Sequence, residues 1–171
     1  MEKPMTVAQS LRHARHDFLN DLQLIKMNLD LGRLQEAQAL IRSYAEASMH
    51  ASRLADIGLP LTEEWLLTVN WRFPGFNFHV ECQAVTAPAH LDGEFRRFLD
   101  DFVELAKKHL SPYQVFDCEM LLKSDAAFFE INIKCSESWP DLNIVEADGF
   151  TVRKECSEDS TMIAVRAQME G

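Results

Sequence analysis

Apolar residues recur every three or four positions over the first sixty residues, which is the spacing of helices with one apolar face. From Thr6 to Leu31 the sequence contains neither proline nor glycine, so this segment is predicted to be one long helix. The pattern pauses at Gly32, resumes, and ends before Pro60, which predicts a second helix and an antiparallel hairpin. The apolar positions are Leu11, Ala14, Phe18, Leu22, Ile25 and Leu29 in the first helix, and Leu34, Ala37, Ile41, Tyr44 and Ala55 in the second.

A hairpin of two helices cannot bury both of its apolar faces. Leu19 and Leu24 flank the first apolar stripe, so this face is wide enough to receive a further helix. A symmetric dimer, in which two hairpins form a four-helix bundle, buries these faces and needs no protein other than a second copy of this chain. We therefore expect a homodimer.

The pattern changes after residue 60. Residues 76–82 alternate between apolar and polar positions, as a half-buried strand does, and residues 93–110 return to helical spacing. Four later segments have the composition of strands: residues 113–122, 127–135, 150–155 and 161–169.

These elements predict an α+β fold with two domains. Residues 1–60 form the helical hairpin, and residues 61–171 form a small α/β sandwich in which a few strands are covered by one or two helices.

The charge and cysteine content limit the classes of partner. The formal charge of −10 repels phosphate backbones and anionic lipids, so neither nucleic acid nor a membrane is expected as a partner. No segment approaches the roughly 20 apolar residues of a membrane span, and the N-terminus lacks a signal pattern. The four cysteines include no C-x-x-C pair, which predicts reduced thiols in a cytoplasmic protein.

The candidate chemistry lies in the first helix. His16 is predicted to face solvent, because it lies about 150° around the helix from the centre of the apolar stripe. A neutral imidazole fixed on a helix is a suitable nucleophile for carrying a phosphoryl group. Arg12 and Arg15 are close enough to offset phosphoryl charge, Asp17 to orient the ring, and Asn20 lies one turn further along the same column.

Spacing alone leaves other interpretations of His16 open. A surface histidine on a helix is often only a solvated residue. His13 and His16, followed by an aspartate, also have the spacing of a metal-binding pair, but the remaining histidines supply no third and fourth ligands at a suitable spacing. We therefore predict no metal site.

The segment Leu11 to Leu29, with its His-Asp-Phe-Leu-Asn core, resembles the phosphoacceptor helix of the sporulation initiation phosphotransferase B family, and more loosely that of citrate-sensor-type histidine kinases. The resemblance implies that His16 is phosphorylated, that the hairpin dimerises, and that the second domain is a degenerate histidine-kinase ATPase domain. It also implies a place in a sporulation phosphorelay, with one receiver domain as phosphodonor and a second response regulator as phosphoacceptor.

The sequence of the second domain supports this degeneracy. Leu105 follows Glu104, where the kinase pattern has a metal-binding asparagine, and Asp148-Gly149 is an isolated turn rather than part of a glycine-rich nucleotide motif. We predict that the chain binds no cofactor, that Mg²⁺ is carried by the partner receiver, and that the phosphoryl group does not come from ATP. A receiver-binding scaffold without phosphotransfer and a divergent autophosphorylating kinase remain the alternatives.

Overall fold

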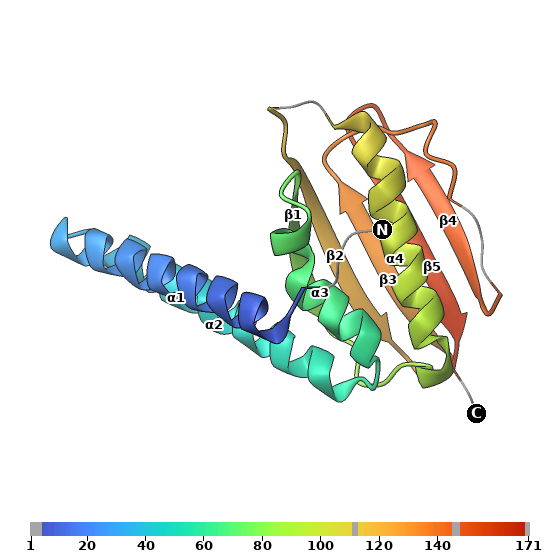
Figure 1. The fold of residues 1–171 in the computed structure, drawn as a ribbon, viewed down its shortest axis with the longest axis horizontal. Coiled ribbons are helices and arrows are strands. Elements are labelled where there is room, and N and C mark those ends of the chain that lie inside the picture. Colours follow the sequence, from blue (N-terminus) through green and yellow to red (C-terminus); the bar gives the residue numbers. More distant parts are fainter. Residues whose placement is uncertain (1–4, 111–112, 145–147, 170–171) are drawn as a thin grey trace. The chain divides into compact units, whose positions relative to one another are not determined.

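The computed structural model describes residues 5–110, 113–144 and 148–169 (Figure 1). The chain divides into two compact units, which meet between Met49 and His50. Its helices are α1 (Val7–Asp30), α2 (Leu34–Asp56), α3 (Pro60–Arg72) and α4 (Asp92–Ala106), with short 3-10 turns η1 (Ala89–Leu91) and η2 (Lys107–His109). Its strands are β1 (Phe76–Cys82), β2 (Phe116–Ser124), β3 (Phe128–Cys135), β4 (Phe150–Cys156) and β5 (Thr161–Gln168).

The first unit is the helical hairpin. Thr6 caps α1 in a capping box, in which its hydroxyl accepts the Gln9 N–H at 3.2 Å and the Gln9 side chain accepts the Thr6 N–H at 2.8 Å. Gly32 turns the chain between the helices at a φ of +70°, a conformation that favours glycine. Both predicted helices are therefore present, with ends within a residue or two of those expected.

The last two turns of α2 belong to the second unit. Leu54 and Ile57 are buried in its core, and His50 and Arg53 contact the backbone of Cys82 at the end of β1. The sequence placed the domain boundary after residue 60, where the helical pattern stops. That boundary stays a prediction. The two compact units meet inside α2, between Met49 and His50, because packing against the strands begins before the helix ends.

The second unit is a two-layer sandwich. Its five strands have the order β1-β2-β3-β5-β4, with β1 and β2 parallel and the other neighbours antiparallel. Helices α3 and α4 cover one face of this sheet, as Figure 1 shows. Phe95, Leu99 and Phe102 of α4 are fully buried against the strands. The α+β class predicted from the sequence is confirmed, whereas the four-helix bundle requires a second chain and stays a prediction.

Helix α3 is the element that the sequence analysis did not predict. It contains no polar stripe of helical period, since Trp65 and Val69 are buried while Leu61 and Leu67 are exposed. The start of α3 is stabilised from another helix: the Asp92 carboxylate accepts the backbone N–H groups of Leu61 and Thr62 at 2.8 and 2.9 Å.

Candidate functional site

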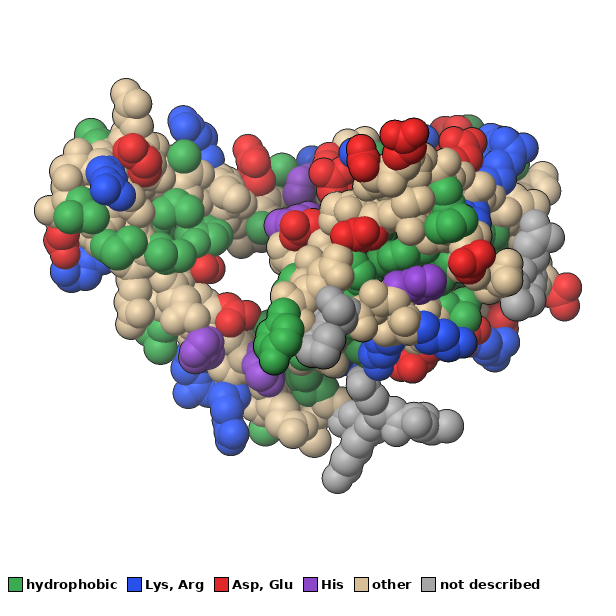
Figure 2. Space-filling model, turned by 90° about the horizontal axis from the view of Figure 1, so that it is seen from above, with side chains coloured by type: hydrophobic (Ala, Val, Ile, Leu, Met, Phe, Trp, Pro, Cys, Tyr) green, Lys and Arg blue, Asp and Glu red, His purple; other side chains and the backbone are tan. Residues whose placement is uncertain are grey.

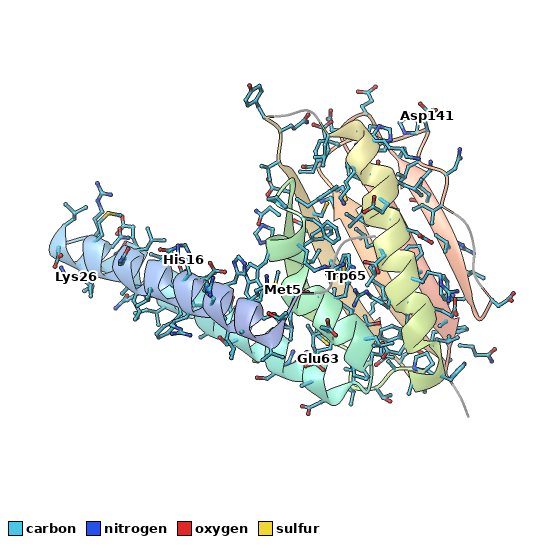
Figure 3. All side chains as sticks on the ribbon, viewed as in Figure 1. Met5, His16, Lys26, Glu63, Trp65 and Asp141 are labelled. Carbon is cyan, nitrogen blue, oxygen red and sulfur yellow. The ribbon has the colours of Figure 1, made fainter. Side chains whose placement is uncertain are left out.

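His16 lies near the middle of α1, and its side chain is 72% exposed (Figure 3). The apolar stripe of α1 is exposed as well in the single chain, for example Phe18 at 60%. What distinguishes His16 is therefore its direction around the helix. Its neighbours one turn away are Arg12 and Asn20, so the imidazole stands on the polar side of α1.

Two side chains of α1 hold the same ring nitrogen of His16. Asp17 Oδ1 lies 3.4 Å from Nδ1, and Asn20 Nδ2 lies 3.2 Å from it. The two contacts call for opposite tautomers, because the Asp17 carboxylate can only accept a proton from Nδ1 and the Asn20 amide nitrogen can only donate one to it. The carboxylate is the stronger partner and favours a proton on Nδ1, and the Asn20 amide then turns its oxygen toward that proton. The second ring nitrogen, Nε2, makes no hydrogen bond or ion pair with another described residue, so with the proton on Nδ1 it is the nucleophilic atom of the neutral ring.

Arg12 and Arg15 form no ion pair with any residue in the described part of the chain. Arg12 is four residues before His16 and lies on the same column of α1, whereas Arg15 is turned by about 100°. The structure therefore brings Asp17 and Asn20 into contact with the imidazole, and leaves both guanidinium groups available to an incoming anion. All five predicted site residues come from this one helix.

One feature of the hairpin escaped the sequence analysis. Tyr44, which the sequence placed on the apolar face of the second helix, is close enough to Asp21 of α1 for that carboxylate to act on its pKa. Partial desolvation, a hydrogen bond to Asp21 and the charge of that carboxylate raise the pKa of Tyr44 above its ordinary value. Asp21 directly follows Asn20 of the candidate site. Its pairing with Tyr44 on the other helix could not be predicted from the spacing of residues along one helix.

The hairpin exposes an apolar face. Leu11, Phe18, Leu22 and Leu29, four of the six residues of the predicted α1 stripe, are each at least 46% exposed. Figure 2 shows hydrophobic side chains gathered on this part of the chain. Contiguous apolar surface of this kind marks an interaction surface.

A cavity of about 800 Å³ lies in the second unit, beside the exposed face of α4. Leu105, the residue found where the kinase pattern has its metal-binding asparagine, lines this cavity. Four carboxylates and two cations surround it, so its field disfavours a polyphosphate. The charged lining residues are Glu94, Asp101, Glu104, Asp148, Arg97 and Lys108.

No group of three or more histidine, cysteine or acidic side chains suited to a metal ion occurs within residues 5–110, 113–144 and 148–169. In the same residues, no helix has the length and hydropathy needed to cross a bilayer.

Comparison with known proteins identifies the hairpin. Residues 1–57 match the family described as "Sensor_kinase_SpoOB-type, alpha-helical domain". The chain is 37% identical over 62 residues to sporulation initiation phosphotransferase B of Bacillus subtilis, a match that covers 36% of this chain. The resemblance to the sporulation initiation phosphotransferase B family is confirmed. The match spans about a third of that relative's length, 32%.

Solved structures similar to the chain are histidine kinases. The histidine kinase domain of the blue-light activated histidine kinase from Erythrobacter litoralis has a TM-score of 0.48 and 11% identity, covering 78% of this chain and 72% of that one. Histidine kinase ThkA, solved in complex with the response regulator protein TrrA, has a TM-score of 0.47 and 10% identity, covering 94% of this chain and 61% of that one.

Proposed function

We propose that this protein is a phosphorelay histidine phosphotransferase that acts in the cytoplasm. His16 accepts a phosphoryl group from the aspartyl phosphate of one receiver domain and passes it to a second response regulator, in a relay that initiates sporulation. The observation that carries the proposal is an exposed imidazole on a helix of the SpoOB type, whose Nδ1 lies beside Asp17 and Asn20 and whose Nε2 makes no hydrogen bond or ion pair with a described residue.

The transfer needs one bond to form and one to break. The lone pair of His16 Nε2 attacks the phosphorus of the aspartyl phosphate, and the bond from phosphorus to the aspartate oxygen breaks, releasing the receiver's carboxylate. Asp17 offsets the positive charge that the ring acquires, because its carboxylate faces Nδ1. Arg12 and Arg15 neutralise phosphoryl oxygens, and Mg²⁺ is supplied by the receiver. Transfer to the second receiver is the same step in reverse.

The proposed working form is a homodimer in which two hairpins form a four-helix bundle. Its support is the exposed apolar stripe of α1, which a second hairpin can cover while His16, on the polar side, stays accessible. Neither nucleic acid nor a membrane is among the proposed partners.

The proposal is tested by phosphotransfer from a receiver. The full chain is incubated with a receiver domain carrying radiolabelled aspartyl phosphate, and acid-labile, alkali-stable label should appear on the protein. His16→Ala should abolish this label, whereas His13→Ala, one turn earlier on α1, should retain it. Label that persists undiminished in His16→Ala contradicts the assignment.

The same experiment separates the two alternatives. A scaffold binds the receiver, as measured by calorimetry, but takes no label from it. A divergent kinase takes label from γ-labelled ATP when no receiver is present. The cavity beside α4 weighs against the kinase, because four carboxylates and two cations line it and their summed field disfavours a triphosphate.

A further inference from the structure

Cys118 and Cys135 lie directly opposite each other on neighbouring antiparallel strands. They are register partners of β2 and β3, and their sulfur atoms are 2.6 Å apart. Both side chains are fully buried, on the face of the sheet that α3 and α4 cover. Opposite residues of an antiparallel pair have Cα atoms about 4.5–5.5 Å apart, which lies within the range that a disulfide spans.

The other cysteines are out of reach of this pair. Cys156 is on the same cross-strand row, but Thr161 of β5 lies between it and Cys135. Two strand spacings amount to about 10 Å, beyond the roughly 7 Å limit for a disulfide. Cys82 is opposite Leu122, four residues along β2 from Cys118, which is about 13 Å. Of the six possible pairs among four cysteines, the fold brings only one into bonding range.

We propose that Cys118 and Cys135 form an oxidisable dithiol site whose co-reactant is a low-molecular-weight disulfide. The thiolate of one cysteine attacks a sulfur of that disulfide and displaces one small thiolate, giving a mixed disulfide. The second cysteine then attacks the protein sulfur and displaces the other small thiolate. One disulfide forms and one breaks, and the two cysteine protons leave on the two small thiols.

Burial determines how this site reacts. A hydrogen bond with Cys135, burial, and the charges of Cys135 and Asp117 raise the pKa of the Cys118 thiol. The Cys118 thiol therefore stays protonated, and the buried pair reacts only when the strands open locally, so exchange in the folded protein is slow. Burial slows the exchange, but the position of the equilibrium between dithiol and disulfide depends on geometry. Because the fold already holds the two sulfurs together, oxidation costs little rearrangement of β2 and β3, and the folded state should favour the disulfide.

The test compares folded and unfolded chain at equilibrium. The full chain carrying Cys82→Ala and Cys156→Ala, which keeps only the opposed pair, is equilibrated in buffers of reduced and oxidised glutathione, with and without urea, and then alkylated. The oxidised folded chain should carry no alkyl group and weigh two hydrogen atoms less than the reduced, unalkylated chain. Its digest should contain one pair of peptides linked through Cys118 and Cys135. The ratio of reduced to oxidised glutathione at which half of the chain is oxidised should be about tenfold or more higher for the folded chain than for the chain in urea.

Two controls make the result decisive. When the chain unfolded in urea is diluted into the same buffers and refolds, it must reach the same half-oxidation ratio. Agreement shows that equilibrium was reached and that slow access of glutathione to the buried thiols does not explain the result. Adding Cys118→Ala to this variant should eliminate the loss of two hydrogens and leave at most a glutathione adduct on Cys135. Equal half-oxidation ratios in urea and in native buffer, or two alkylatable thiols throughout, would overturn the proposal. Phosphorylation of His16 is not involved, so either result leaves the proposed function untouched.

Discussion

The carboxylate of Asp92 is buried, 6% exposed, and both of its oxygens accept backbone N–H groups at the start of α3. No side chain of α3 itself caps this end. In Asp92→Ala, the Thr62 N–H loses its partner in a buried site and the Leu61 N–H loses its partner in a partly buried one. The variant should lose about 2–3 kcal/mol of unfolding free energy, measured by urea denaturation.

Asp101→Ala is the matched control for Asp92→Ala. Asp101 is on the same helix, is exposed, and makes no hydrogen bond or ion pair with other residues of the described segments. Its stability should stay within about 0.5 kcal/mol of the unmodified chain. An equal loss in both variants would mean that Asp92 contributes nothing through its contacts with α3.

Glu130 makes stability depend on pH at the acid end. A hydrogen bond from Lys123, the charge of Lys123 and weaker contributions from Asn132 and Arg166 lower its pKa below the ordinary 4.5. The unfolded chain therefore takes up this proton at a higher pH than the folded protein. The stabilisation is complete above the ordinary value and is lost as pH falls through the lower folded value.

The variant Glu130→Gln should remove this acid sensitivity. Its unfolding free energy should decline less between about pH 5 and pH 3 than that of the unmodified chain, measured by thermal unfolding at a series of pH values. The control is Glu119→Gln, whose partner Lys134 is 3.7 Å away and whose side chain is 71% exposed. Identical pH profiles for the unmodified chain and Glu130→Gln would refute the role of Glu130.

Sequence reasoning could propose the whole candidate site, because one helix supplies all of its residues; their roles stay a prediction. The direction of His16 and its neighbours Asp17 and Asn20 follow from helical geometry alone. What the spacing could not give is the convergence of both neighbours on Nδ1, which depends on rotamers. The pairing of Cys118 with Cys135 was equally hidden, because strand register and not sequence separation puts them together.

At the scale of elements, periodicity found α1, α2, α4 and all five strands, and it failed for α3. Helix α3 packs between its neighbours and has apolar residues on several sides, so it lacks the two-sided pattern that identifies a helix at a surface. Pro60 was interpreted as the end of the previous helix, although proline is also common at the first position of a new one, as here.

The parallel pairing of β1 and β2 was also not predicted. A helix between two strands is the connection that parallel neighbours need, and α4 provides it. The outer edge of β1 is then capped by side chains. Asn70 donates to the Phe78 carbonyl at 2.9 Å and accepts the Phe78 N–H at 2.8 Å, which blocks pairing with another strand. Such long-range caps depend on the assembled fold and leave no periodic signal.

At the scale of the whole molecule, charge is unevenly distributed. Residues 1–49 contain six of the 17 basic and six of the 27 acidic residues, so the entire formal charge of −10 lies in residues 50–171. An anionic group is therefore repelled by the second unit and meets no net charge on the hairpin. This distribution favours approach of an aspartyl phosphate to α1, where Arg12 and Arg15 supply local positive charge.

The proposed association of two chains through the hairpin surface is the largest-scale prediction. If the apolar stripe of α1 forms the dimer core, Phe18→Glu places two buried charges in it, one from each chain. The loss of two Phe contacts amounts to about 3 kcal/mol or more, which weakens dimerisation by roughly 100-fold. Gln23→Glu makes a similar change in charge on the His16 side of α1 and should leave the dimer intact. Sedimentation equilibrium over a concentration series measures both dissociation constants.

Because a partner bound only to the folded state stabilises it, the melting temperature of the unmodified chain should also rise with protein concentration, and that of Phe18→Glu should not. An unmodified chain that stays monomeric at micromolar concentrations, or a Phe18→Glu variant that dimerises as tightly, would contradict the proposed bundle.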